Sequence, residues 1–273
     1  MTRWIFVFLI TAAGVFASAT TNAQAETQEN LFFLHHSTGR HLVTDGLVRN
    51  WITDLNQELG SGFVLWDHDY NYLGLSNPDG VLTDRCYNIP GDNTDPDGLH
   101  NLWTTSNSAR DSILTNHQLV AFKSCYPASD IGSDSELTQY KTWYLEMRDF
   151  FDTQPNTTFI VMSTPPRHPL ATDLDDADRA RAFANWLDSE QYLSGHDNLL
   201  CFNLFDLWAH PDDGSPDRNM LREAYVRSIH DPDSHPNDLA NQTVGPIFAE
   251  FLTRAGRVPN STTSLGQVKA LFR

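Results

Sequence analysis

The sequence predicts a three-layer α/β/α domain around a mainly parallel five-stranded sheet. Three observations predict it: short apolar runs recur along the chain, most are apolar throughout, and amphipathic helical patterns lie between the later runs. Strands that are apolar on both faces are typical of parallel sheets covered by helices on both sides. Alternation of strands and helices over the whole chain implies right-handed crossovers, which place helices on both faces of the sheet.

The predicted elements follow in chain order. The five strands are residues 31–35, 62–66, 118–123, 157–162 and 198–203, and the clearest helical patterns are residues 135–151, 176–189 and 237–255. In the last helix the apolar positions are expected to share one face. These positions are Leu239, Val244, Ile247, Phe248 and Phe251.

Residues 67–102 differ from the rest of the chain. They are rich in Asp, Asn, Gly, Pro and Tyr and show little helical periodicity. We expect a long excursion over the strand ends, and loops of this length are usually functional or disordered. The aromatic content of this excursion favours a function.

The N-terminus is typical of a secretory signal peptide. Residues 1–25 carry Arg3, then an apolar stretch from Trp4 to Phe16, and then the small-x-small pattern Ala23-Gln24-Ala25. The apolar stretch is shorter than the roughly 20 residues that a membrane span needs. We therefore expect cleavage before Glu26, one domain over residues 26–273, and a secreted or periplasmic protein without a membrane span.

Charge and cysteine content narrow the function classes. The formal net charge is −17, which repels phosphate backbones, so nucleic acid is not an expected partner. The three cysteines form at most one disulfide, so no cysteine framework holds the fold. Cys201 lies in an apolar run and is predicted to be buried. A Cys86–Cys125 bridge is left open.

Two short blocks carry the residues of a nucleophile and its base. Ser37 follows the first predicted strand and precedes Gly39, so its hydroxyl can lie on a strand-to-helix turn beside backbone N–H groups. A serine in this position is also a common helix N-cap. His235 stands in Asp233-Ser234-His235-Pro236, just before the last predicted helix. It can accept the serine proton if a carboxylate fixes its tautomer.

These blocks resemble those of the SGNH, or GDSL-like, hydrolase family. The serine of that family follows the first strand, and its acid and histidine lie together before the last helix. The resemblance implies a flavodoxin-like SGNH fold, a serine-esterase mechanism without a cofactor, Ser37 as nucleophile and His235 as base. The first block reads His-His-Ser-Thr-Gly, where the family has Gly-Asp-Ser.

The acid of the triad has two candidates. The family motif has its acid three residues before the histidine, where this chain has Pro232, with Asp231 and Asp233 on either side. Residues two apart in an extended segment project to the same side, so Asp233 is the favoured orienting residue. Asp231 reaches His235 only through a helical turn, which the following Pro232 disfavours.

The family completes its oxyanion hole with residues after the second and third strands. Beside the amide of Ser37, the candidates here are Gly74 after the second strand and Ser124 or Ser129 after the third. The alternative for each of these three is an ordinary turn residue.

The loop after the fourth strand, residues 163–169, is expected to open on the same side as Ser37. Arg167 and His168 are candidate substrate-binding residues, because binding residues concentrate on loops held by a rigid scaffold. A solvated loop without a role is the competing interpretation.

No metal is expected. His35 and His36 are adjacent, and adjacent residues of a strand point to opposite faces, so they cannot chelate one ion in extended geometry. One of them is expected to be buried and hydrogen-bonded. Residues 93–98 are similar to the start of a calcium loop, but Thr104 stands where the closing glutamate is needed.

The predicted function is that of an exported serine esterase that removes acetyl groups from a polysaccharide. The carbohydrate part depends on export and on the aromatic residues Trp66, Tyr70 and Tyr72. The expected partner is an acylated carbohydrate or another small ester. Two alternatives stay open: an acyltransferase that uses the same site on a glycan, and a glycan-binding protein of the same fold without catalysis.

Overall fold

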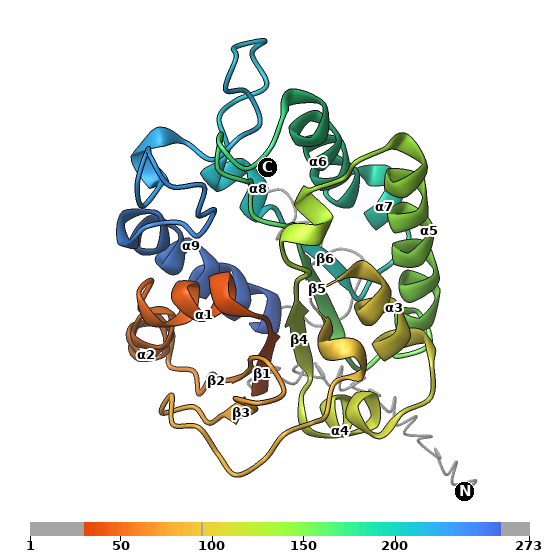
Figure 1. Cartoon of the computed structure of the whole chain (residues 1–273). Coiled ribbons are helices and arrows are strands. Elements are labelled where there is room, and N and C mark those ends of the chain that lie inside the picture. The colour runs from red at the N-terminus through yellow and green to blue at the C-terminus, as the bar shows by residue number, and fades with distance from the viewer. Residues whose placement is uncertain (1–29, 94, 258–273) are drawn as a thin grey trace, which may run out of the picture.

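The computed structural model describes residues 30–93 and 95–257, and a six-stranded sheet forms its centre (Figure 1). The order of strands is β3-β2-β1-β4-β5-β6, and every pair is parallel except β2 with β3. The expected signal peptide, residues 1–25, lies outside the described residues. The strands are β1 (Asn30–Leu34), β2 (Val64–His68), β3 (Leu75–Ser76), β4 (Leu119–Phe122), β5 (Thr158–Met162) and β6 (Leu199–Phe202).

The strands are apolar throughout because both faces of the sheet are buried. In β1, Leu31 and Phe33 belong to one hydrophobic cluster, whereas Phe32 and Leu34 belong to another on the opposite face. All four side chains have 0% exposure. The alternation of side chains along a strand thus feeds two separate cores, one on each side of the sheet.

Two layers of helices cover these faces, so the three-layer α/β/α prediction is confirmed (Figure 1). On one face lie α1 (Ser37–Thr44), α2 (Val48–Leu59), α8 (Leu204–Trp208) and α9 (Asp238–Arg257). On the other lie α3 (Pro96–Thr104), α4 (Ser108–Asn116), α5 (Asp134–Phe151), α6 (Leu174–Leu187) and α7 (Glu190–Leu193). Short 3₁₀ turns η1 (Pro90–Asn93), η2 (Tyr126–Ser129) and η3 (Glu223–Tyr225) connect them.

The excursion over residues 67–102 contains more regular structure than expected. β3 lies within it and raises the number of strands from the predicted five to six. α3 lies at its end, begins with Pro96 in the first turn and buries Leu99, Leu102 and Trp103 completely. Proline is favoured in a first helical turn, so Pro96 is compatible with a helix start. The low helical periodicity of the whole segment therefore does not indicate this short helix.

One position of the last helix was also assigned wrongly. Val244, Phe248 and Phe251 are buried as predicted, but Leu239 is 55% exposed. Five residues separate Leu239 from Val244, and at 3.6 residues per turn this rotates their side chains about 140° apart. Leu239 therefore lies off the buried face.

α9 packs unusually close to the turn between α1 and α2. A Cβ atom on Gly245 would overlap the carbonyl group of Gly46, so the backbones of these two segments are in direct contact here. The close contact ties α9 to the layer that begins at Ser37. It thereby positions the loop just before α9, which contains His235.

The sheet order places its topological switch point at the carboxyl ends of β1 and β4. The chain leaves β1 to form β2 on one side and later returns to form β4 on the other. In open α/β sheets this reversal of direction is where ligands bind. Ser37 follows β1, and Lys123 begins the segment that follows β4.

Candidate active site

Ser37 is the first residue of α1 and is half-buried. The glycine two residues later is required by packing. A Cβ atom on Gly39 would overlap Cβ of His35 and would lie 3.2 Å from Cε of Lys123. Lys123 is 0% exposed and donates to the carbonyl oxygen of Ser124 at 3.1 Å. The absence of a side chain at Gly39 thus lets the first turn of α1 lie directly on the end of β4.

The N-terminus of α1 offers backbone donors. No side chain caps it, and its first turn contains no acidic residue. Among the described residues, no acceptor is recorded for the N–H groups of Ser37 and Thr38, whereas that of Gly39 donates to the carbonyl oxygen of His36 at 2.6 Å. Uncapped N–H groups at a helix N-terminus favour an anion.

His235 and Asp233 form a tightly bonded pair. Oδ1 of Asp233 accepts from Nδ1 of His235 at 2.6 Å and from its backbone N–H at 3.0 Å. Oδ2 lies 3.6 Å from Nη1 of Arg227. Burial acts to raise the pKa of Asp233, but the hydrogen bonds from His235 and the charges of His235 and Arg227 outweigh it, so the pKa is lowered. With Nδ1 donating, Nε2 of the neutral ring is left as the acceptor.

Asp231 does not share this position. Its carboxylate accepts from the backbone N–H of Asp233 at 3.1 Å, and its side chain is exposed. Asp233 rather than Asp231 is therefore the carboxylate that contacts His235.

The loop that carries His235 is fixed at both ends. Asn237 caps α9 by accepting from the N–H of Ala240 at 3.0 Å, and its amide group donates to the carbonyl oxygens of Ala224 and Val226. Ser234 is buried and accepts from the backbone N–H of His168 at 3.0 Å. The hydrogen bonds of Ser234 and Asn237 thus hold the segment that carries His235 at the start of α9.

Aromatic and hydroxyl side chains link the His235 loop to α1. The ring of His235 lies 5.5 Å from that of Tyr126 and 6.2 Å from that of His41, one helical turn after Ser37. The hydroxyl of Thr38 donates to the Tyr126 phenol at 3.4 Å. The base candidate therefore lies beside α1, the helix that begins at Ser37.

Ser37 and His235 are not directly bonded in the part of the chain that the structure describes. Ser37 instead lies close to the phenol of Tyr70. Burial raises the pKa of that phenol, which stays protonated near neutral pH. Catalytic hydrogen bonds are often absent or long without substrate, so this arrangement is compatible with a Ser37–His235 pair.

Tyr126 is a site residue that the sequence reasoning missed. It lies in the segment after the third predicted strand, for which the sequence suggests only the serines as polar donors. Burial raises the pKa of its phenol, which therefore remains a hydrogen-bond donor at neutral and mildly alkaline pH. Its contact with Thr38 places it beside the uncapped N–H groups of α1.

The three residues proposed to complete the oxyanion hole have other partners. The N–H of Gly74 donates to the carbonyl oxygen of Tyr70 at 2.8 Å, so this amide is not free for a substrate. The hydroxyl of Ser129 donates to the carbonyl oxygen of Pro165 at 2.6 Å. Ser124 is 0% exposed, and its hydroxyl lies 3.5 Å from that of Tyr144 in the core. The amides at the start of α1 and the Tyr126 phenol are therefore the candidate donors instead.

The two candidate substrate-binding residues also serve the loops around them. His168 is 2% exposed, its Nε2 donates to the carbonyl oxygen of Ser228, and its Nδ1 accepts from the N–H of Leu170. Arg167 forms an ion pair with Asp130. A buried ring with both nitrogens bonded is not placed to touch a substrate, so His168 acts as a strut for the loop of His235.

The paired histidines occupy separate environments. His35 is buried and bonds through Nε2 to Asp67 at 3.0 Å, as expected for one of the pair, and Asp67 also pairs with Arg49. The ring of His36 packs on that of Tyr70 with centroids 4.5 Å apart. Within the described residues, no group of three or more His, Cys, Asp or Glu side chains is placed to hold a metal ion.

A stacked aromatic pair, of which one ring is exposed, borders the site. Tyr70, which contacts both Ser37 and His36, stacks on Tyr72 with centroids 5.4 Å apart and an interplanar angle of 12°. Tyr72 is 77% exposed. A flat aromatic surface therefore faces solvent beside the nucleophile candidate.

Comparison with known proteins identifies no relative that assigns a chemistry. No protein-family model matches the chain, and no curated protein matches it. Among solved structures, the chain is similar to one described as a gut microbial diltiazem-metabolizing enzyme, at 10% identity and a TM-score of 0.42. The match covers 82% of this chain and 46% of that enzyme, so this chain spans less than half of the enzyme's length. A similarity this distant carries no information about the reaction.

Of the helices within the described ranges, none is long and apolar enough to cross a membrane.

Proposed function

We propose that this protein is an exported serine esterase of the SGNH type. The observation that carries the proposal is the bond between Asp233 and Nδ1 of His235, in a cluster that includes the first turn of α1. This bond fixes the tautomer in which Nε2 accepts a proton. Ser37, at the start of the same turn, supplies the hydroxyl.

The proposed reaction follows from these roles. Nε2 of His235 takes the proton of the Ser37 hydroxyl as Oγ attacks the ester carbonyl, and the resulting imidazolium is stabilised by Asp233. His235 then protonates the leaving alcohol. Water, deprotonated by the same imidazole, releases the acyl group from Ser37 and restores the serine.

The oxyanion of the tetrahedral intermediate requires donors within hydrogen-bond distance. The candidates are the N–H groups of Ser37 and Thr38, which are uncapped, and the phenol of Tyr126, which is protonated. The Thr38 hydroxyl connects the two sets of donors, because it contacts the Tyr126 phenol. The positive end of α1 adds to the stabilisation of negative charge.

An acylated glycan is the proposed substrate. Stacked Tyr70 and Tyr72 beside Ser37 provide a flat surface of the kind on which sugar rings pack. Beyond Pro127, a hollow of about 530 Å³ is lined by aromatic and carboxylate side chains. They include Asp95, Asp97, Glu136, Tyr140 and Trp143. Rings for stacking beside carboxylates that accept from sugar hydroxyls support a chain of sugar units as the ligand.

A glycan-binding protein without catalysis is the alternative that a specific observation favours. Within the described residues Ser37 makes no bond to His235 and lies beside the Tyr70 phenol instead. If this arrangement persists with ligand bound, the serine serves the aromatic surface and performs no chemistry.

A substrate panel tests the proposal. Acetylated polysaccharides and short aryl esters are incubated with the wild type and with Ser37→Ala, and released acid is measured. The proposal predicts release by the wild type and loss with Ser37→Ala. Product analysis with a glycan acceptor present separates hydrolysis from acyl transfer. Glycan binding by both proteins without any release of acid would establish the alternative.

A further inference from the structure

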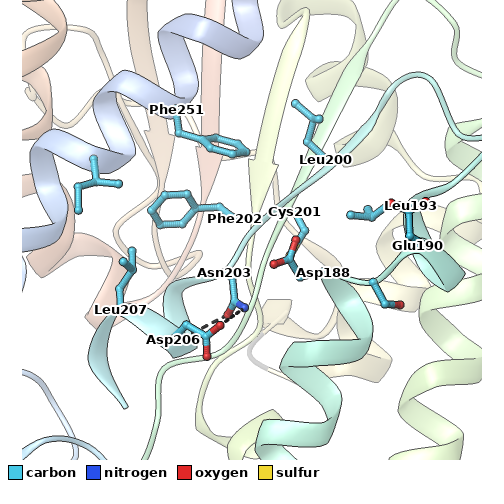
Figure 2. A pocket seen from close by; sticks show the side chains of 12 residues that line it. Asp188, Glu190, Leu193, Leu200, Cys201, Phe202, Asn203, Asp206, Leu207 and Phe251 are labelled. Carbon is cyan, nitrogen blue, oxygen red and sulfur yellow. Dashed lines mark hydrogen bonds between the residues drawn. The ribbon is translucent and has the colours of Figure 1, made fainter. Parts of the chain in front are cut away.

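A groove lies along the outer edge of the sheet at β6, on the side of the sheet away from β3. Its volume is about 490 Å³. Leu200, Cys201 and Phe202 of β6 form its floor, and Ile247 and Phe251 of α9 form one wall. Figure 2 shows Phe251 and Leu207 on one side of β6 and Leu193 and Glu190 on the other. The floor is apolar, with Leu200, Cys201 and Phe202 between 1% and 8% exposed.

The backbone of β6 makes this edge a place for pairing. The N–H of Phe159 donates to the carbonyl oxygen of Asn198, and that of Ser163 donates to the carbonyl oxygen of Phe202. Because successive residues of a strand alternate in direction, the N–H and carbonyl groups of Cys201 point away from β5, toward the groove. β6 has no partner strand on this side among the described residues. An unpaired edge of this kind is a template for association with another chain.

The rim of the groove is acidic. Asp188, Glu190 and Asp206 contribute three carboxylates around the apolar floor, and no lysine or arginine lines it in the described part of the chain. Asp206 also pairs with Arg181 and accepts from the Asn203 amide, as Figure 2 shows for Asn203. Apolar side chains together with positive charge therefore complement this groove.

Residues 258–273 meet both requirements. They follow α9, which ends at Arg257, and their second half reads Leu-Gly-Gln-Val-Lys-Ala-Leu-Phe-Arg. This segment holds Lys269 and Arg273 and no acidic residue, in a chain that carries 35 acids against 18 lysines and arginines. Its apolar residues Val268, Leu271 and Phe272 match the apolar floor.

The length of chain also suffices. Phe251 lies six residues before Arg257, which is roughly 9 Å along the helix at 1.5 Å per residue. The connecting residues 258–264 include Pro259, Asn260 and Ser261, types that favour turns. Seven extended residues span up to roughly 23 Å, so the segment from Leu265 onward can return to the groove.

We propose that residues 265–273 dock in the groove along β6 and cover the free edge of the sheet. The docked segment shields the edge from other chains, and its two cations lie near the acidic rim. This inference is independent of the proposed esterase activity, because the groove lies at β6 and not at the switch point between β1 and β4.

Disulfide trapping in the full chain tests the proposal. In a background of Cys86→Ala and Cys125→Ala, the remaining native thiol is Cys201 in the floor of the groove. Val268→Cys is added in one variant and Ser261→Cys, in the connecting residues, in a matched control. Both are oxidised at low protein concentration, and the disulfides are identified by mass spectrometry of proteolytic fragments. We expect an intramolecular Cys201 disulfide to form at least tenfold faster with Val268→Cys.

Charge reversal provides a second measurement. The double substitution Lys269→Glu and Arg273→Glu should slow the trapping in the Val268→Cys variant and increase the rate at which a thiol reagent modifies Cys201 in the absence of an engineered cysteine. Equal trapping rates for Val268→Cys and Ser261→Cys would overturn the proposal, since they would indicate a segment that samples the groove without docking. A disulfide between two chains would also overturn it, because the groove would then bind a second copy.

Discussion

Asp233 binds His235 twice through the same oxygen, which lies 2.6 Å from Nδ1 of the ring and 3.0 Å from the backbone nitrogen. The two-residue separation makes this possible in an extended loop, and Arg227 holds the other carboxylate oxygen. The arrangement fixes both the rotation and the tautomer of the imidazole. The predictions about catalysis follow from this pair.

Asp233→Asn is expected to lower kcat by roughly 10³-fold to 10⁴-fold, because an amide in this position allows the wrong tautomer of His235. Asp231→Asn should change kcat by no more than about twofold, since Asp231 contacts the Asp233 backbone and not the ring. Steady-state kinetics of both variants, with folding checked by circular dichroism, makes the comparison. A crippled Asp231→Asn beside a normal Asp233→Asn would reverse the assignment.

Tyr126→Phe removes the phenol proposed to stabilise the oxyanion. We expect kcat to fall by about 10²-fold with little change in KM, as for loss of one oxyanion donor, because the interaction strengthens only in the transition state. Tyr192→Phe is the matched control, since the buried Tyr192 hydroxyl donates to the carbonyl oxygen of Tyr144 on α5, away from both Ser37 and the hollow beyond Pro127. Equal effects of the two substitutions would exclude Tyr126 from the oxyanion hole.

Tyr72→Ala tests the glycan part of the proposal. Removing the exposed ring should raise KM for an acetylated polysaccharide about tenfold and leave kcat/KM for a short aryl ester within about twofold, as a stacking contribution of roughly 1.4 kcal/mol implies. Trp51→Ala is the control, because Trp51 is 41% exposed on α2. If both substrates lose rate equally with Tyr72→Ala, the ring does not select glycans.

A buried histidine should make the fold sensitive to acid. Burial lowers the pKa of His117 to about 4, and its ring stacks on Phe32 and bonds to Tyr87. The unfolded chain takes up this proton near pH 6.5, so folding stability from this group is complete above that pH and is lost as the pH falls toward 4. Between pH 7 and pH 4.5 the loss amounts to roughly 2 to 3 kcal/mol.

Urea unfolding of the wild type and of His117→Phe at these two pH values checks this expectation. On acidification His117→Phe should lose roughly 2 to 3 kcal/mol less stability than the wild type. The control His230→Phe, at an exposed position, should behave as the wild type does. Identical acid sensitivity of the wild type and His117→Phe would show that other groups govern it.

The strands and the layers were predictable because burial on both faces leaves a strong sequence signal. Each of the five apolar runs became a strand within a few residues of its expected bounds. β3 has only two residues, too few for any periodicity, so it was missed. α3 carried a signal in the spacing of Leu99, Leu102 and Trp103, but the prolines, glycines and aspartates before it outweighed that signal.

The site was predictable where its residues are close in sequence. Asp233 and His235 are two residues apart, and local backbone geometry decides between Asp233 and Asp231. Tyr126 contacts Thr38, and Tyr70 lies beside Ser37. The members of each pair are far apart in the sequence, so no local pattern predicts these contacts. The role of His168 depended on burial in the same way, since its partners lie far along the chain.

Covalent labelling distinguishes an activated Ser37 nucleophile from an unreactive serine. The protein is treated with a fluorophosphonate probe, and the modified residue is identified by mass spectrometry. We expect one adduct, located on Ser37, that is absent from Ser37→Ala and forms at least 10²-fold more slowly in His235→Ala. An unlabelled wild type, or labelling that persists in Ser37→Ala, would show that Ser37 is not the nucleophile.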